Sequence, residues 1–382
     1  MTLATHVSTA TDPRARGREL GEAHRDAVRA TAATYLELFA AHGADEARVR
    51  GWAERALDAT AGWAPAAAAE IEGIAAGSGL PLWRVAALTA RTEILAAADV
   101  TGHGECSTAV VLPGDGTAPR TVQTWDWHDV LRGAMLGRTL RPAPGRWVCT
   151  FTEAGVIGKI GVSSAGLGLH FNALKHASDT PDIGVPVHVV ARRILDEADT
   201  VADAVALARS ARLSASTVVT VVTRGEARCL ELSPAGVGEV APDATGFLAH
   251  TNHFLDPRLV DGERADADST TWRRLAWLRA HRDALAAPDP TARARALHAH
   301  AADGAAVCAH PDLALAPHER WESLATVAID VVDRSLHVAV GGPCTVGPDS
   351  WQVLRAAAPV PVHRPTATGQ RSRGRNRPVR AR

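Results

Sequence analysis

The chain has 382 residues, of which 46% are hydrophobic and 22% charged, so it has the composition of a soluble globular protein with a large core and not of a disordered chain. Its formal net charge of -1 at pH 7 excludes a strong overall attraction to nucleic acid or to anionic membranes. We find no signal peptide and no run long enough to span a bilayer, and the five cysteines are widely spaced. We therefore expect a cytoplasmic protein with reduced thiols.

The first hundred residues are predicted to be helical. Leu20, Ala27 and Leu38 recur at helical spacing in the first pattern. A Gly-Leu-Pro turn precedes the last of the helical patterns. The expected helices cover residues 17–42, 45–61, 66–76 and 81–98.

From Cys106 the pattern changes to strands rich in Val, Ile, Thr and aromatic residues, separated by Gly and Pro turns. Runs of strands followed by runs of helices indicate an α+β fold, with two stacked antiparallel sheets flanked by helices. We expect Asp199 to cap the second helix of this part. Strands are predicted at 107–112, 120–127, 146–152, 156–162, 166–173, 216–222, 227–233, 246–252, 325–332 and 335–341, and helices at 184–197, 200–212, 268–287 and 290–303.

The C-terminal end is basic and lacks apolar periodicity, so residues 364–382 are predicted to be a disordered tail. A solvated tail explains this composition without a nucleic-acid partner, and we expect none.

Cys106 follows a glycine-rich segment, 102–104, and opens a predicted strand. Glycines permit strained backbone, and a thiol aimed at the preceding carbonyl can start an N-to-S acyl shift. Hydrolysis would then break the Glu105–Cys106 bond and leave an α-amino group with a pKa of about 7.7–8.0, which can act as the base for the thiol. Taken locally, a buried structural cysteine explains Cys106 equally simply.

Asp126 and Asn252 are the polar residues best placed to assist Cys106. On a strand, Asp126 points away from Trp125 and Trp127, and its carboxylate can hold an α-amine. Asn252 ends an apolar strand, and its amide can donate to an oxyanion. The alternative is that both residues only form turns.

Other polar residues leave further interpretations open. His250 and His253 have ligand-like spacing, but residues three apart in an extended segment point to opposite faces, so no metal is expected there. We expect His298 and His300 to be surface residues of a helix. Lys159 lies in a predicted strand and is either solvated or near the site.

Taken together, several segments resemble the acyl-coenzyme A:isopenicillin N acyltransferase family of N-terminal-nucleophile enzymes, in the family's order, from about residue 15 to about residue 350. These segments are 88–93 (LTARTE), 105–108 (ECST), 125–126 (WD), 152–161 (TEAGVIGKIG), 164–166 (SAG), 171–174 (FNAL), 184–186 (GVP) and 250–253 (HTNH).

The resemblance implies a four-layer αββα fold and self-cleavage into two chains that stay associated. Residues 1–105 would form a small helical chain and residues 106–363 the catalytic chain. The roles that it implies are nucleophile and base for Cys106, orientation of the new amine for Asp126, oxyanion stabilisation for Asn252, and substrate binding for Trp127, His128 and Asn172.

Three departures from the family's pattern concern the site. Glu105 replaces a glycine before the nucleophile, Thr124 replaces an asparagine, and residues 322–324 contain no match for an active-site arginine. The acyl acceptor therefore stays open between water and an amine. We expect a small-molecule acyl substrate, which includes acyl-coenzyme A, and no cofactor. The alternatives are a non-catalytic binding protein that retains the fold and a metal-dependent hydrolase that uses His250 and His253.

Overall fold

The structure is a computed structural model that describes residues 2–100, 105–266 and 268–357. The basic tail and the glycines of 102–104 lie outside the described residues. The helices are α1 (Pro13–Ala23), α2 (Arg25–Ala41), α3 (Glu46–Trp63), α4 (Pro65–Ser78), α5 (Leu82–Thr89), α6 (Arg91–Ala97), α7 (Val187–Glu197), α8 (Val201–Ser210), α9 (Thr271–Ala280), α10 (Arg282–Leu285) and α11 (Pro290–Ala296).

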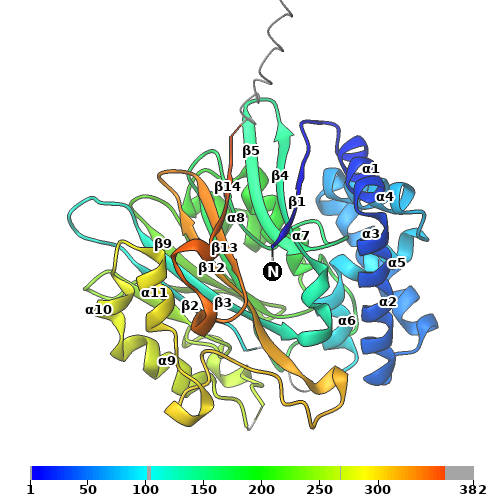
Figure 1. The fold of residues 1–382 in the computed structure, drawn as a ribbon. Helices are drawn as coiled ribbons and strands as arrows, with labels where there is room; N and C mark the ends of the chain where they lie inside the picture. Colours follow the sequence, from blue (N-terminus) through cyan, green and yellow to red (C-terminus); the bar gives the residue numbers. More distant parts are fainter. Residues whose placement is uncertain (1, 101–104, 267, 358–382) are drawn as a thin grey trace, which may run out of the picture.

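The strands form two sheets (Figure 1). The larger sheet contains, in spatial order, β1 (Ala4–Val7), β4 (Met135–Ala143), β5 (Arg146–Glu153), β6 (Ile160–Ser163), β7 (Gly168–Ala173), β8 (Thr217–Val222), β9 (Ala227–Ser233) and β10 (Gly236–Val240). The smaller sheet contains β11 (Phe247–His250), β2 (Ser107–Val111), β3 (Arg120–His128), β12 (Trp321–Asp330), β13 (Ser335–Val340) and β14 (Gln352–Arg355). Neighbouring strands are antiparallel except β1 and β4.

The elements stack in four layers. Helices α7 and α8 pack on the larger sheet, and α9, α10 and α11 pack on the smaller one. The two sheets face each other through β5 and β13, β6 and β12, and β2 and β7. This is the αββα arrangement that the resemblance implied, which confirms the expected fold class. Figure 1 shows α1 to α5 beside the layers.

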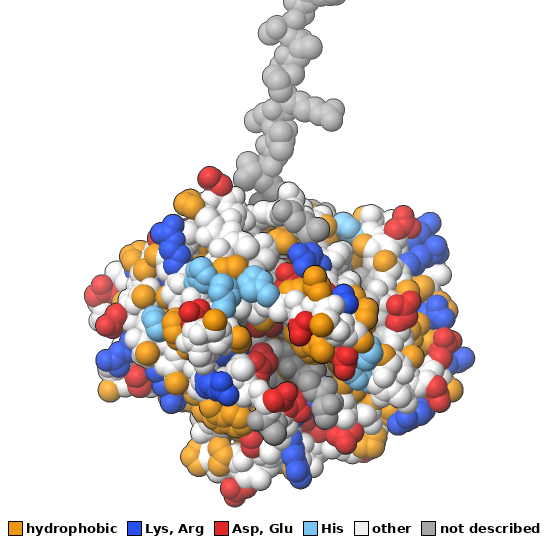
Figure 2. Space-filling view, turned by 60° about the horizontal axis from the view of Figure 1, so that its bottom comes forward, with side chains coloured by type: hydrophobic (Ala, Val, Ile, Leu, Met, Phe, Trp, Pro, Cys, Tyr) orange, Lys and Arg blue, Asp and Glu red, His pale blue; other side chains and the backbone are white. Residues whose placement is uncertain are grey.

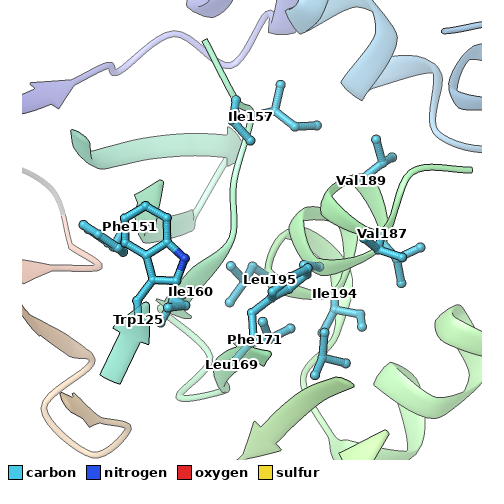
Figure 3. Packing of buried hydrophobic residues seen from close by; sticks show 14 of the residues in the cluster. Trp125, Phe151, Ile157, Ile160, Leu169, Phe171, Val187, Val189, Ile194 and Leu195 are labelled. Atoms are coloured by element: carbon cyan, nitrogen blue, oxygen red, sulfur yellow. The ribbon is translucent and has the colours of Figure 1, made fainter. Parts of the chain in front are cut away.

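The main core lies between the sheets and under α7 (Figure 3). Trp125 of β3 meets Phe151 of β5 edge to face, with ring centroids 5.2 Å apart. β8 is buried along its whole length and is rich in valine, as expected for a strand covered on both faces. A second core, which includes Leu275 and Leu278, fills the space under α9 to α11.

A buried carboxylate, Glu70 of α4, joins the N-terminal helices to the sheets. It accepts hydrogen bonds from Arg16 of α1 at 2.8 Å, from Arg138 of β4 at 2.6 Å and from Arg192 of α7 at 3.0 Å. Burial would raise the pKa of Glu70, but the three guanidinium groups outweigh it and hold this pKa well below its usual range. The network therefore holds together segments from both sides of residue 105.

Several element predictions need correction. The expected helix 17–42 is divided at His24 and the helix 81–98 at Ala90, where the backbone leaves helical geometry for one residue. The helix expected over 290–303 ends at Ala296, so His298 and His300 lie outside it. The strand expected over 156–162 begins only at Ile160, because a turn precedes it.

Strands β1, β4, β10 and β14 were not predicted. Three of them are short edge strands with little apolar alternation. In β4 the buried Arg138 interrupts the apolar pattern. The cap of α8 is Thr200 and not Asp199, since Thr200 Oγ1 accepts from Asp203 N at 3.1 Å while Asp199 pairs with Arg146.

Candidate active site

Cys106 directly precedes β2, whose Ser107 pairs with Thr124 of β3. The Cys106 side chain is buried, and its Sγ lies 3.9 Å from the Asp126 carbonyl oxygen. Burial, and the nearby Asp126 charge, raise the pKa of the thiol to about 12. In the intact chain, therefore, the thiol is neutral and requires a base before it becomes a good nucleophile.

Asp126 lies on β3, opposite Ser323 of β12. Ser323 Oγ donates to Asp126 Oδ1 at 2.7 Å, while Oδ2 is buried with no hydrogen-bond partner among the described residues. Burial raises the pKa of this carboxyl to about 8. An unpaired, buried carboxylate oxygen is costly, and a cation placed beside it would relieve that cost.

Arg274 of α9 connects the groups around Cys106. Its Nη1 donates to the Cys106 carbonyl oxygen at 2.6 Å and to Ser107 Oγ at 3.0 Å. Its Nη2 donates to Asn252 Oδ1 at 3.0 Å. The side chain is fully buried, so this guanidinium fixes the start of β2 relative to the segment that carries Asn252.

Glu105 is anchored on the other side of the expected cleavage point. Its carboxylate accepts from Ser269 Oγ at 2.5 Å and from Thr270 N at 2.9 Å, and it lies 3.4 Å from Arg274. Burial would raise the pKa of Glu105, but Arg274 and these hydrogen bonds outweigh burial and lower the pKa. Glu105 is thus held as a carboxylate.

Asn252 follows β11 and is fixed on several sides. Its backbone N–H donates to Thr271 Oγ1 at 2.8 Å, and its Nδ2 donates to the Ala173 carbonyl oxygen at 2.9 Å. The Asn252 backbone is therefore fixed to Thr271, and its amide plane is set by the Ala173 carbonyl oxygen of β7 and by Arg274 of α9.

A cleft of about 240 Å³ opens at this point. It brings three of the predicted site residues together, because Glu105, Asp126 and Asn252 all line it. Cys106 lines a narrow gap on the other side of Ala173, which borders both. The remaining walls are Leu174, Lys175, Ala265, Asp266, Asp268, Ser269, Ala306, Ala309 and Trp321.

The residues predicted to bind substrate are buried, and none of the three lines this cleft, although Trp127 lines the narrow gap beside Cys106. Trp127 Nε1 donates to Tyr35 OH at 2.8 Å. The His128 ring lies 4.0 Å from the Trp321 ring, and Trp321 lines the cleft. Asn172 accepts from Thr108 Oγ1 at 2.7 Å and donates to the backbone carbonyl oxygens of His250, at the end of β11, and of Thr251. All three side chains thus contact other protein groups.

Lys159 is fully buried and is not a solvated strand residue. Its Nζ lies 2.6 Å from Glu153 Oε2 and 3.5 Å from the centre of the Trp125 ring. Burial lowers the pKa of Lys159 to about 7 against the opposing effect of Glu153. The Lys159 ammonium group favours the Cys106 thiolate, but its effect on the thiol pKa is smaller than that of burial.

His250 and His253 have separate partners. His250 Nε2 lies 2.7 Å from Glu231 Oε1, and His253 Nδ1 lies 2.9 Å from Thr271 Oγ1. The two rings do not converge, so nothing supports a metal-dependent hydrolase at this pair.

Arg274 is the main site residue that the sequence interpretation missed. The buried residues of α9 are Thr271, Arg274, Leu275 and Leu278, which follow helical spacing. An arginine in the apolar stripe of a helix was therefore visible in the sequence and indicates a buried, paired guanidinium.

Two sheets between helical layers, with Cys106 directly before β2, are the arrangement that the resemblance implied for the N-terminal-nucleophile fold. Residues 114–343 match the family model for acyl-coenzyme A:6-aminopenicillanic acid acyl-transferase. The chain belongs to this family. The matched residues include Asp126 and Asn252 and begin after Cys106.

A curated relative is the acyl-coenzyme A:6-aminopenicillanic-acid-acyltransferase 40 kDa form of Emericella nidulans, 30% identical over 186 residues, which are 49% of this chain and 51% of the relative. The match thus spans about half the length of that relative. Among solved structures, the chain is similar to a Caenorhabditis elegans N-acylethanolamine-hydrolyzing acid amidase ortholog (12% identity, TM-score 0.43, 59% of this chain and 93% of the other). It is also similar to penicillin V acylase from Agrobacterium tumefaciens (10% identity, TM-score 0.40, 62% and 83%). These distant likenesses say nothing about substrate.

The described residues contain no helix that is both long and apolar enough to cross a membrane.

Proposed function

We propose that this protein cleaves its own Glu105–Cys106 bond and then transfers acyl groups from small amides or thioesters through an acyl-Cys106 intermediate. The observation that carries the proposal is the approach of Cys106 Sγ, directly before β2, to within 3.9 Å of the backbone carbonyl oxygen of Asp126 on the adjacent strand β3. Asp126 lines the cleft, and Cys106 lines the narrow gap beside it. The buried Asp126 Oδ2 has no partner among the described residues, and a new ammonium group at Cys106 would supply one.

The cleavage step conserves atoms and charge. Cys106 Sγ attacks the Glu105 carbonyl carbon, the C–N bond breaks, and the thiol proton goes to the departing amine nitrogen. Water then attacks the resulting thioester, and one of its protons returns to Sγ to regenerate the Cys106 thiol. The proton of the new main-chain carboxyl of Glu105 goes to the Cys106 α-amine, which leaves a carboxylate and an ammonium group. Arg274 and the groups around Glu105 hold the two sides of the bond in place for this reaction.

After cleavage the Cys106 α-amino group serves as the base for its own thiol, and Asp126 orients that amine. The acyl donor lies in the cleft, where Leu174 and Trp321 supply apolar walls. Asn252 Nδ2 donates to the oxyanion of the tetrahedral intermediate. Trp127 meets Trp321 edge to face and His128 lies tilted against it, so both residues position this wall.

Water or an amine then releases the acyl group. The name of the Emericella nidulans relative describes transfer from acyl-coenzyme A to 6-aminopenicillanic acid, which supports testing thioester donors and amine acceptors in addition to amides. Release of acyl product with and without an added amine distinguishes transfer from hydrolysis. No cofactor is needed for either.

The deciding experiment compares the denatured intact masses of the wild type, Cys106→Ala and Cys106→Ser. We expect the wild type to separate into chains that end at Glu105 and begin at Cys106, while Cys106→Ala stays whole and is inactive. An uncleaved wild-type chain, or full activity in Cys106→Ala, would contradict the proposal. A wild type that is both uncleaved and inactive would favour a non-catalytic binding protein.

A further inference from the structure

Four metal-ligating side chains converge away from Cys106. We call them the Cys2His2 cluster: His300, Cys308, His310 and Cys344. Three of them lie in the segment between α11 and β12, and the fourth lies in the turn after β13. One ligand atom from each residue lies within 4.8 Å of every other. Figure 2 shows one face of the molecule, on which histidine side chains gather.

The three distances from His310 Nε2 to the other ligand atoms match those around a single tetrahedral ion. Zn–S bonds of about 2.3 Å and Zn–N bonds of about 2.0–2.1 Å at tetrahedral angles separate two nitrogens by about 3.3 Å and a nitrogen from a sulfur by about 3.5 Å. His310 Nε2 lies 3.1 Å from His300 Nε2, 3.5 Å from Cys344 Sγ and 3.8 Å from Cys308 Sγ. Each measured distance is within about 0.3 Å of the tetrahedral value.

The chemistry of the ligands selects the ion. Two thiolates and two imidazoles are the donor set of structural zinc sites, whereas calcium and magnesium prefer oxygen ligands. Four protein ligands would fill a tetrahedral ion and leave no position for substrate. The cluster is therefore suited to a structural role.

A glycine beside the cluster leaves space for one of its thiols. A Cβ atom at Gly342 would lie 2.8 Å from Cys308 Sγ, so only glycine leaves room for the thiol at this position. The His298 ring lies edge-on to the His300 ring, with centroids 4.8 Å apart, and His298 is not a member of the cluster.

We propose that the Cys2His2 cluster binds one structural zinc ion. The ion would join the segment before β12 to the turn after β13 and stabilise the long connection from α11. This inference is independent of whether the chain cleaves itself.

The zinc site also borders the catalytic cleft, and this consequence rests on the proposed function. Ala309, between two ligands, lines the cleft, and its N–H donates to Ser323 Oγ at 2.9 Å. Ser323 in turn donates to Asp126 Oδ1. Ser323 N also donates to the Ala309 carbonyl oxygen at 3.0 Å. Zinc would thus act as a positioning element for Asp126.

The test measures metal by mass spectrometry in full-length protein made in zinc-supplemented medium. We expect about one zinc ion per chain in the wild type, in Cys106→Ala and in His298→Ala, which alters a neighbouring histidine outside the cluster. Cys344→Ser and His310→Ala should lose stoichiometric zinc. Because these variants can fold poorly, Cys344→His provides a second test: it keeps a donor and should retain zinc.

Cobalt(II) titration of the stripped protein gives an independent readout. Tetrahedral thiolate coordination should produce visible ligand-field and near-ultraviolet charge-transfer bands in the wild type, and the latter should weaken in Cys344→His. Absence of zinc together with absence of these bands would overturn the proposal. So would a Cys308–Cys344 disulfide, seen as the loss of two hydrogens from the unreduced mass.

Metal removal from a Cys106-containing chain before cleavage should slow cleavage, because Asp126 would lose the support that reaches it through Ala309 and Ser323. Because the zinc content of Cys106→Ala does not depend on cleavage, failure of the zinc site and failure of self-cleavage give different results.

Discussion

At the scale of single residues, the site depends on charges held where water cannot reach them. Asp126 is fully buried, with one oxygen bound to Ser323, and its pKa is raised to about 8. A carboxyl whose pKa is raised by folding contributes stability at low pH that is lost as the pH rises towards the folded pKa. The intact chain should therefore lose stability between about pH 4 and pH 8 because of this group.

Replacing Asp126 with asparagine should remove that pH dependence. We compare the free energies of unfolding of Asp126→Asn and its parent in the uncleavable Cys106→Ala background. Between pH 5 and pH 8 the difference should shift in favour of Asp126→Asn by on the order of a few kcal/mol, because only the parent loses stability. Urea unfolding at both pH values measures this shift. With Cys106 intact, the same substitution should slow cleavage. A difference that is equal at both pH values would mean that the Asp126 carboxyl does not titrate in this range.

Individual residues also show what the sequence could and could not predict. Cys106 and Asp126 were predicted from several short segments that follow the order of the acyltransferase family, and not from either local pattern alone. Arg274 resembles its neighbouring arginines in composition, and only its place in the apolar stripe of α9 distinguishes it. Cys344 is 34 residues from His310 along the chain, so no ligand spacing connects them. Contacts of this kind arise from the fold and not from local sequence.

At the scale of elements, α1 and α4 pack with their backbones in direct contact. Gly17 and Gly21 of α1 face Gly73 and Gly77 of α4. A Cβ at Gly73 would lie 2.2 Å from the Arg14 carbonyl oxygen, which is closer than any real contact. This close approach brings Arg16 within reach of Glu70.

Gly73→Ala should therefore destabilise the protein, by about 1–3 kcal/mol or more, because the two backbones must separate. Gly62→Ala in α3 is the matched control, since nothing lies within 4 Å of its added Cβ. This control should be neutral or more stable by up to about 1 kcal/mol, as alanine favours helix. Equal melting temperatures for the two variants would show that the α1–α4 contact is loose.

At the scale of the whole molecule, the predicted cleavage point separates elements that the fold holds tightly together. Residues before 105 contribute β1, which pairs with β4, and Glu70, which pairs with Arg138 and Arg192. The buried Arg91 likewise pairs with Glu153 at 3.0 Å. The two chains of a cleaved molecule should stay associated through native chromatography and separate only in denaturant.

Glu70→Gln should cost about 3–5 kcal/mol of stability, because it leaves buried guanidinium groups without their shared counter-charge. Glu72→Gln is the control, since Glu72 lies on the same helix and pairs with Arg14 near the surface. That control should change stability by less than about 0.5–1 kcal/mol. Denaturant unfolding in the Cys106→Ala background compares them, and similar losses in both would argue against a shared role of Glu70.

Once the chain is cut, the stability that the Glu70 network provides has a different physical meaning. In the intact polypeptide, Glu70 and its arginines are tethered, and their encounter is an intramolecular loop closure. In a cleaved molecule the same contacts form between two separate solutes, so unfolding becomes a dissociation whose midpoint depends on protein concentration. Dilution would then weaken the mature protein and leave its precursor unaffected, and recovery after denaturation would become a second-order process.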